Sequence, residues 1–84
     1  MSVPLRQCDI VRVVRLNSPT RKFDGTEGVK RAPKVGDEAI ICHQYDPTDA
    51  TATVAVEMVD KGGMTVWLAD FAPEELELVS RPKP

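Results

Sequence analysis

The 84-residue sequence predicts a single, nearly all-β domain built as a small five-stranded barrel. Its apolar and β-branched residues fall into short runs with the periodicity of strands, and no run has the 3.6-residue repeat of a helix. Clusters of turn-forming residues separate the runs at intervals short enough for a small barrel. A barrel also removes sheet edges, which a chain of this length has little other means to cover.

The first predicted strand spans residues 8–16 and is rich in valine. Successive side chains of a strand point to opposite faces of its sheet. If Val11 and Val13 face the core, Ile10 and Val14 lie on the outer face. This strand is therefore apolar on both sides.

A long polar loop follows at residues 17–34, punctuated by Pro and Gly. Loops of this length in so small a domain tend to be functional or mobile. Phe23 is its one aromatic residue. It is interpreted either as an anchor that packs down onto the domain or as an exposed binding residue.

The rest of the chain predicts three strands joined by tight turns, one helical turn, and a short last strand. The predicted boundaries are 39–45, 51–59 and 64–70 for the three strands, 72–76 for the helical turn, and 77–79 for the last strand. This element order is that of an SH3-like barrel: a strand, a long loop, three strands, a helical turn and a last strand. We expect one domain over residues 1–84, with its core in 8–79 and a frayed tail at 80–84.

A family of small bacterial SH3-like barrel domains of unknown function has a similar pattern between residues 35 and 79. The matching residues are Val35, Gly36, Asp37, Ile41 and Tyr45, then Val56, Glu57, Asp60, Gly63 and Thr65, then Leu76. The sequence departs from the pattern at Ala39, where the family has Gly, and at Met58, where it has Phe. The resemblance implies the barrel fold and a bacterial protein, and it implies no activity.

The plasmid-type dihydrofolate reductases are a second group of short SH3-like barrels, which assemble around a central pore. Their V-Q-I-Y motif for folate and nicotinamide aligns here with Val66-Trp67-Leu68-Ala69. Both polar residues of that motif are missing. Their absence argues against dihydrofolate reductase activity. A shared mode of assembly stays open.

The charge distribution makes nucleic acid an unfavourable partner. The formal net charge is −2, with +3 on residues 1–42 and −5 on residues 43–84. Nonspecific nucleic-acid binding needs many basic groups. It also uses aromatic side chains among them for base stacking, and here Phe23 is the one aromatic residue among the basic ones. The asymmetry favours pairing with a charged partner or with a second copy, unless folding mixes the two halves.

The sequence offers no catalytic constellation, and we expect no metal site and no cofactor. Cys42 and His43 are adjacent on a strand and so point to opposite faces, and His43 is the single histidine. Zinc needs three or four such ligands. We interpret Cys42 as a small buried apolar residue and His43 as a half-exposed one.

The strand at 64–70 is also apolar on both faces, which predicts an outer apolar surface used for contacts. Either Trp67 and Phe71, or the residues alternating with them, lie outside together with Ile10 and Val14. We favour self-association through this surface, with Trp67 as its anchor. The rival interpretation is that the long loop folds over it.

These observations predict an interaction module, most simply a cytoplasmic homo-oligomer or a binder of another protein, and favour a non-enzymatic role. The predicted interface residues are Trp67, Phe71, Ile10, Val14, Phe23, Arg21 and Lys22. Two alternatives stay open: a ligand binder or enzyme with its site between subunits, and an RNA- or ribosome-associated barrel. No apolar run is long enough for a membrane helix.

Overall fold

A computed structural model describes residues 4–18 and 20–82. It contains one antiparallel sheet of five strands, β1 (Ile10–Val13), β2 (Glu38–Gln44), β3 (Val54–Val59), β4 (Thr65–Phe71) and β5 (Leu76–Ser80). A 3-10 turn, η1 (Pro73–Glu75), lies between β4 and β5. The strands are ordered β4-β3-β2-β1-β5 across the sheet. The prediction of an all-β chain with five strands and one helical turn is therefore confirmed.

The strand β1 is shorter than the sequence predicts because a turn and a bulge precede it. The N–H of Asp9 donates to the carbonyl of Arg6 at 3.1 Å, and Cys8, the third residue of this turn, has a positive φ of 76°. Cys8 and Asp9 then both face Ile41: the Cys8 N–H donates to the Ile41 carbonyl, and the Ile41 N–H donates to the Asp9 carbonyl. Two residues of one strand that lie opposite a single residue of the next strand form a β-bulge. Regular pairing therefore starts only at Ile10.

Aspartate side chains determine the turns of the β2-β3-β4 meander. Asp46 and Asp49 each accept hydrogen bonds from the backbone N–H and the hydroxyl of the threonine two residues later. These bonds use groups that a longer strand would need for pairing, so β3 begins at Val54 and not at residue 51. Asp60 caps the β3-β4 hairpin in the same way, and Gly63 supplies its positive φ.

All five strands contribute to one core. Val11, Val13, Ile41, Val56, Trp67 and Phe71 are each 0% exposed. The orientation predicted for β1 is therefore confirmed, since Val11 and Val13 point inward and Val14 is exposed. Of the two alternatives for β4, the one that places Trp67 and Phe71 outside is wrong, and so is the choice of Trp67 as the anchor of an outer surface. Their cross-strand partners Met58 and Val54 share the inner face with them.

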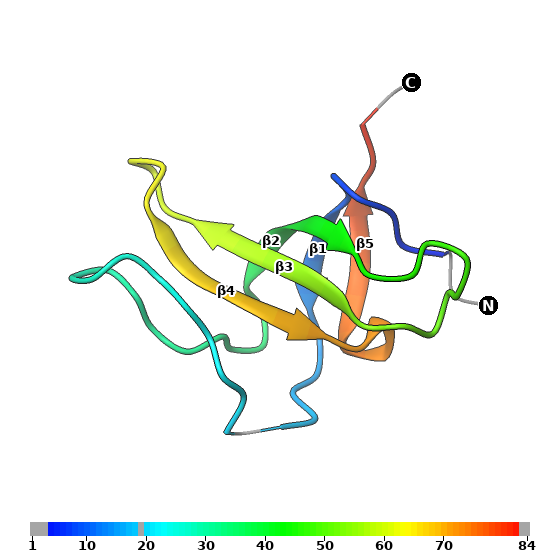
Figure 1. The fold of residues 1–84 in the computed structure, drawn as a ribbon. Coiled ribbons are helices and arrows are strands. Elements are labelled where there is room, and N and C mark those ends of the chain that lie inside the picture. The colour runs from blue at the N-terminus through cyan, green and yellow to red at the C-terminus, as the bar shows by residue number, and fades with distance from the viewer. Residues whose placement is uncertain (1–3, 19, 83–84) are drawn as a thin grey trace.

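The sheet curls around this core without closing. In Figure 1, β1 and β5 run steeply across the direction of β3 and β4. Within the described residues no ladder joins β4 to β5, so closure into a barrel, which the sequence predicts, is not seen. None of the described helical segments is long and apolar enough to span a membrane.

The C-terminal segment is ordered further than predicted. Ser80 belongs to β5, and Arg81 donates two hydrogen bonds to the carboxylate of Asp9, at 2.9 and 2.8 Å, and one to the carbonyl of Pro4 at 2.7 Å. The predicted frayed tail thus does not begin at residue 80, and its last two residues lie outside the described part of the chain. The Arg81 contacts join the two ends of the described chain.

Candidate functional site

The long loop lies along the free edge of β4 (Figure 1). Asp24 and Leu68 exchange two backbone hydrogen bonds, at 2.9 and 2.8 Å. The N–H groups of Thr26 and Arg31 donate to the carbonyls of Thr65 and Val66. This contact needs Gly25, because a Cβ atom there would lie 2.5 Å from the Lys30 Cβ and 2.7 Å from the Val66 carbonyl oxygen. The loop therefore pairs with one edge of the sheet, whereas the rival interpretation placed it over an outer face.

A buried carboxylate holds the first part of the loop. Glu75 accepts from the Arg21 guanidinium at 2.7 and 2.6 Å, from the Asn17 N–H at 2.8 Å and from the Ala72 N–H at 2.9 Å. Burial alone would raise the pKa of Glu75, but these donors hold that pKa below its usual value. The Arg21 guanidinium also lies 4.1 Å from the centre of the Phe71 ring. Arg21 is thus a structural residue whose charge is balanced.

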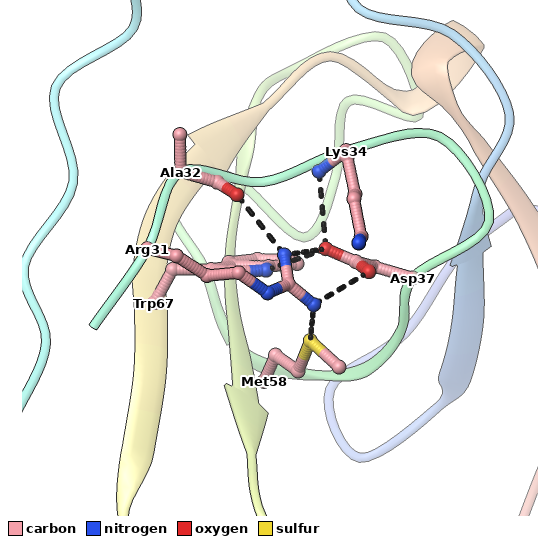
Figure 2. Close-up of polar contacts among 6 residues, drawn as sticks. All are labelled: Arg31, Ala32, Lys34, Asp37, Met58 and Trp67. Atoms are coloured by element: carbon pink, nitrogen blue, oxygen red, sulfur yellow. Dashed lines mark hydrogen bonds and ion pairs between the residues drawn. The ribbon is translucent and has the colours of Figure 1, made fainter. Parts of the chain in front are cut away.

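A second buried carboxylate holds the end of the loop (Figure 2). Asp37 accepts two hydrogen bonds from the guanidinium of Arg31, at 2.8 and 2.9 Å, one from the indole of Trp67 at 2.9 Å and one from the Lys34 N–H at 3.0 Å. Burial would raise the pKa of Asp37, but these four donors lower it. Both oxygens of the Asp37 carboxylate are thus engaged by donors from within the chain. Its role is to fix Trp67 in the core.

A hollow lies between the loop and the sheet, and we call it the loop groove. Its volume is about 780 Å³. One wall is formed by residues 20–24, including Lys22 and Phe23. The other side is formed by Cys42 on β2, Tyr45 after it, Ala55 on β3, and Leu68, Ala69 and Asp70 on β4.

The loop groove combines exposed aromatic surface with free charges. Tyr45 is 54% exposed, and its hydroxyl donates to Asp70 at 2.6 Å, which raises the pKa of Tyr45. His43 packs edge-on against Tyr45, with the ring centres 5.1 Å apart. Phe23 is half-buried and packs against the core, so its interpretation as the loop's anchor is confirmed. Lys22 is exposed and lines the wall.

The arrangement of Cys42 does not favour nucleophilic chemistry. The prediction that Cys42 is buried is wrong: its thiol is exposed and contacts the Ala55 carbonyl at 3.4 Å. Cys42 is an extra residue at a bulge of β2, where the register shifts between Ile41 and His43. Partial desolvation, with the nearby carboxylates of Glu57 and Asp70, raises the pKa of this thiol and so keeps it protonated. The described residues hold no cluster of three or more metal-ligating side chains.

A second, smaller hollow lies on the outer face of β1, β2 and β3. Ile10 pairs with Ile40 across β1 and β2, and Val59 lies beside them at 48% exposure. The hollow has a volume of about 270 Å³, and Glu38 and Glu57 also line it. We call Ile10, Ile40 and Val59 the outer strip.

The structure thus separates the seven predicted interface residues into three places. Trp67 and Phe71 are in the core. Arg21 pairs with Glu75 and also lines the loop groove. Phe23 and Lys22 line the loop groove, and Ile10 and Val14 lie outside on and after β1. Tyr45 was not predicted as a groove residue, although an aromatic residue just before the Asp46 turn cluster was a usable signal. The buried roles of Asp9, Asp37 and Glu75 were not predicted either, and the sequence holds no signal for them.

Comparison with protein-family models, with curated proteins and with solved structures found no match for this chain.

Proposed function

We propose that this chain is a non-enzymatic interaction module of the SH3-like barrel class that binds an extended segment of a partner protein in the loop groove. The observation that carries the proposal is the groove itself, with an exposed tyrosine at one side and a wall held by buried ion pairs. A volume of about 780 Å³ falls in the range of specific ligand sites.

The barrel class is supported by topology. The order β4-β3-β2-β1-β5, the long β1-β2 loop and the 3-10 turn before the last strand are those of an SH3-like barrel, and one core lies inside the curled sheet. A rigid sheet that carries a functional loop is a common arrangement for binding sites.

Two other functions have less support. The Asp37 carboxylate is engaged by internal donors and the Cys42 thiol is protonated, so neither group is prepared to act as a base or a nucleophile. RNA binding is disfavoured because four of the eight basic residues in residues 1–42 are engaged in ion pairs. Arg12, Arg15, Arg21 and Arg31 all pair with carboxylates.

The test is a selection of peptides from a random phage-displayed library on the immobilised full chain. We expect enriched peptides whose affinity falls at least about fivefold on Tyr45→Ala, the loss of roughly 1 kcal/mol that marks a significant contact residue. Val35→Ala is the matched control, because Val35 is exposed and does not line the groove. Absence of enriched peptides, or equal binding by Tyr45→Ala, would refute the proposal.

A second candidate function, self-association, is favoured by the outer strip. Exposed apolar side chains on neighbouring strands are typical of contacts between copies. We expect light scattering after gel filtration to give a mass that rises with concentration for the wild type and stays monomeric for Ile40→Lys. Val35→Lys, which places the same charge away from the strip, should behave as the wild type. A monomer at every concentration of the wild type would exclude this role.

A further inference from the structure

We infer that the occupant of the loop groove is a basic peptide segment, one that places a Lys or Arg side chain beside Tyr45 and Asp70. This inference rests on the proposed function and specifies its ligand. It follows from the balance of charges along the groove, from the surroundings of Cys42 and from the groove's size.

The charges that line the groove leave an excess of carboxylate. Arg21 is balanced by Glu75 at 2.6 Å and contributes no net charge to a ligand. Asp24 and Asp70 also line the groove, and Lys22 is the cation that opposes them. Asp70 accepts only the neutral hydroxyl of Tyr45 among the described contacts, so its negative charge is not cancelled. With Glu75 counted as the counter-charge of Arg21, these groups leave one net negative charge at the groove.

The surroundings of Cys42 add a further carboxylate, Glu57, to this balance. The Cys42 thiol lies in the groove, and the carboxylates of Glu57 and Asp70 both act on it to disfavour the thiolate. Desolvation is the largest cause of the raised pKa of Cys42 and disfavours any charge, so the attraction for a cation comes from the two carboxylates themselves. The exposed face of Tyr45 adds an attraction for an ammonium or guanidinium group.

The volume and the apolar floor favour a peptide over a small cation. About 780 Å³ is much more space than one ammonium group or one Lys side chain occupies. Ala55 and Leu68 form apolar floor next to the charged groups. A segment of several residues would cover that floor with apolar side chains while its basic residue meets Asp70.

The experiment measures the affinities of synthetic peptides made from the enriched phage sequences, together with versions in which every Lys and Arg is replaced by Gln. We expect the Gln versions to bind more weakly, and added salt to weaken only the parent peptides. On the protein, Asp24→Asn and Asp70→Asn should each lower the affinity about 1.4- to 5-fold, the range of partly exposed charge pairs. Lys22→Glu should raise it by a similar factor.

The matched control is Glu27→Gln, which removes an exposed carboxylate of the same loop that does not line the groove. It should leave the affinity unchanged. Peptides that need Tyr45 but bind equally well without their basic residues would overturn this inference and leave the proposed function standing. No enriched peptide at all, or binding that does not depend on Tyr45, would overturn both.

Discussion

At the residue scale, three buried carboxylates each form an ion pair with one arginine side chain. Asp9, Asp37 and Glu75 are almost fully buried, and each is paired with one arginine that comes from a loop or from the C-terminal segment. Removing one partner of such a pair costs far more than the pair contributes, because the other charge stays buried. Each pair therefore acts as a specific attachment point.

The backbone of Cys8 adopts a conformation that is unfavourable for a residue with a side chain. Its φ of 76° is a left-handed conformation that favours glycine, at the third position of a turn and the first position of a bulge. Cys8→Gly removes a cost of about 1–2 kcal/mol and adds about 0.4–1 kcal/mol of unfolded-chain entropy. We expect a net gain of about 0.5–1 kcal/mol in the free energy of unfolding, measured by urea denaturation.

Cys8→Ser serves as the control for loss of the thiol, because it keeps a Cβ atom in the same conformation. It should leave the stability close to that of the wild type. If the Cys8→Gly protein is no more stable than Cys8→Ser, a side chain at this position of the turn carries no free-energy cost, and the prediction is contradicted.

At the scale of elements, the long loop is an extension of the sheet. It pairs with β4 through Asp24, and it is attached at its start by Glu75 and at its end by Asp37. One wall of the loop groove belongs to this loop, so the shape of the groove depends on these attachments. The same contacts cover the β4 edge, which would otherwise be open to pairing with other chains.

Glu75→Gln tests the attachment at the start of the loop. The substitution keeps the shape of the side chain but leaves the Arg21 guanidinium, 12% exposed, without a counter-charge. We expect a loss of about 3–5 kcal/mol in the free energy of unfolding, as for other broken buried pairs. Faster hydrogen exchange of the Asp24 and Leu68 amides should accompany it.

Glu74→Gln is the matched control in the neighbouring position. Glu74 is exposed, and its pair with Arg15 is 3.5 Å long, so its loss should cost less than about 1 kcal/mol. Equal effects of the two substitutions would contradict the structural role assigned to Glu75.

At the scale of the whole molecule, a small core is supplemented by the three buried ion pairs. Donors lower the pKa of Asp9, Asp37 and Glu75 in the folded chain, chiefly through the hydrogen bonds from Arg81, Arg31 and Arg21. In the unfolded chain the same groups titrate near pH 4. Because the folded values lie lower, the stability they contribute is complete above about pH 4 and is lost as the pH falls through the folded values.

We therefore expect a steep loss of stability below about pH 4 and little change between pH 5 and 8, where these carboxylates are ionised in both states. Fluorescence of the single, fully buried Trp67 reports unfolding in a pH titration. In Glu75→Gln one of the three groups no longer titrates, so the acid dependence should be shallower. A wild-type stability that stays constant well below pH 4 would contradict this account.

The sequence by itself determined the local features of this protein. The alternation of Val11 and Val13 with outward residues, the aspartate turns at Asp46 and Asp60, and the proline of η1 depend on neighbours a few residues away. Such short-range preferences are readable from one chain. The five strands, their order along the chain and the turn before the last strand could therefore be predicted.

Only the tertiary structure decided which face of β4 is buried and what the long loop does. Trp67 is separated by 30 residues from Asp37, and Arg21 by 54 residues from Glu75. A pattern of apolar residues on both faces of a strand does not say which face is buried, nor that a distant loop will pair with the edge of that strand. The loop groove exists because of these long-range contacts, so the position of Tyr45 and Asp70 in it could not be read from the sequence.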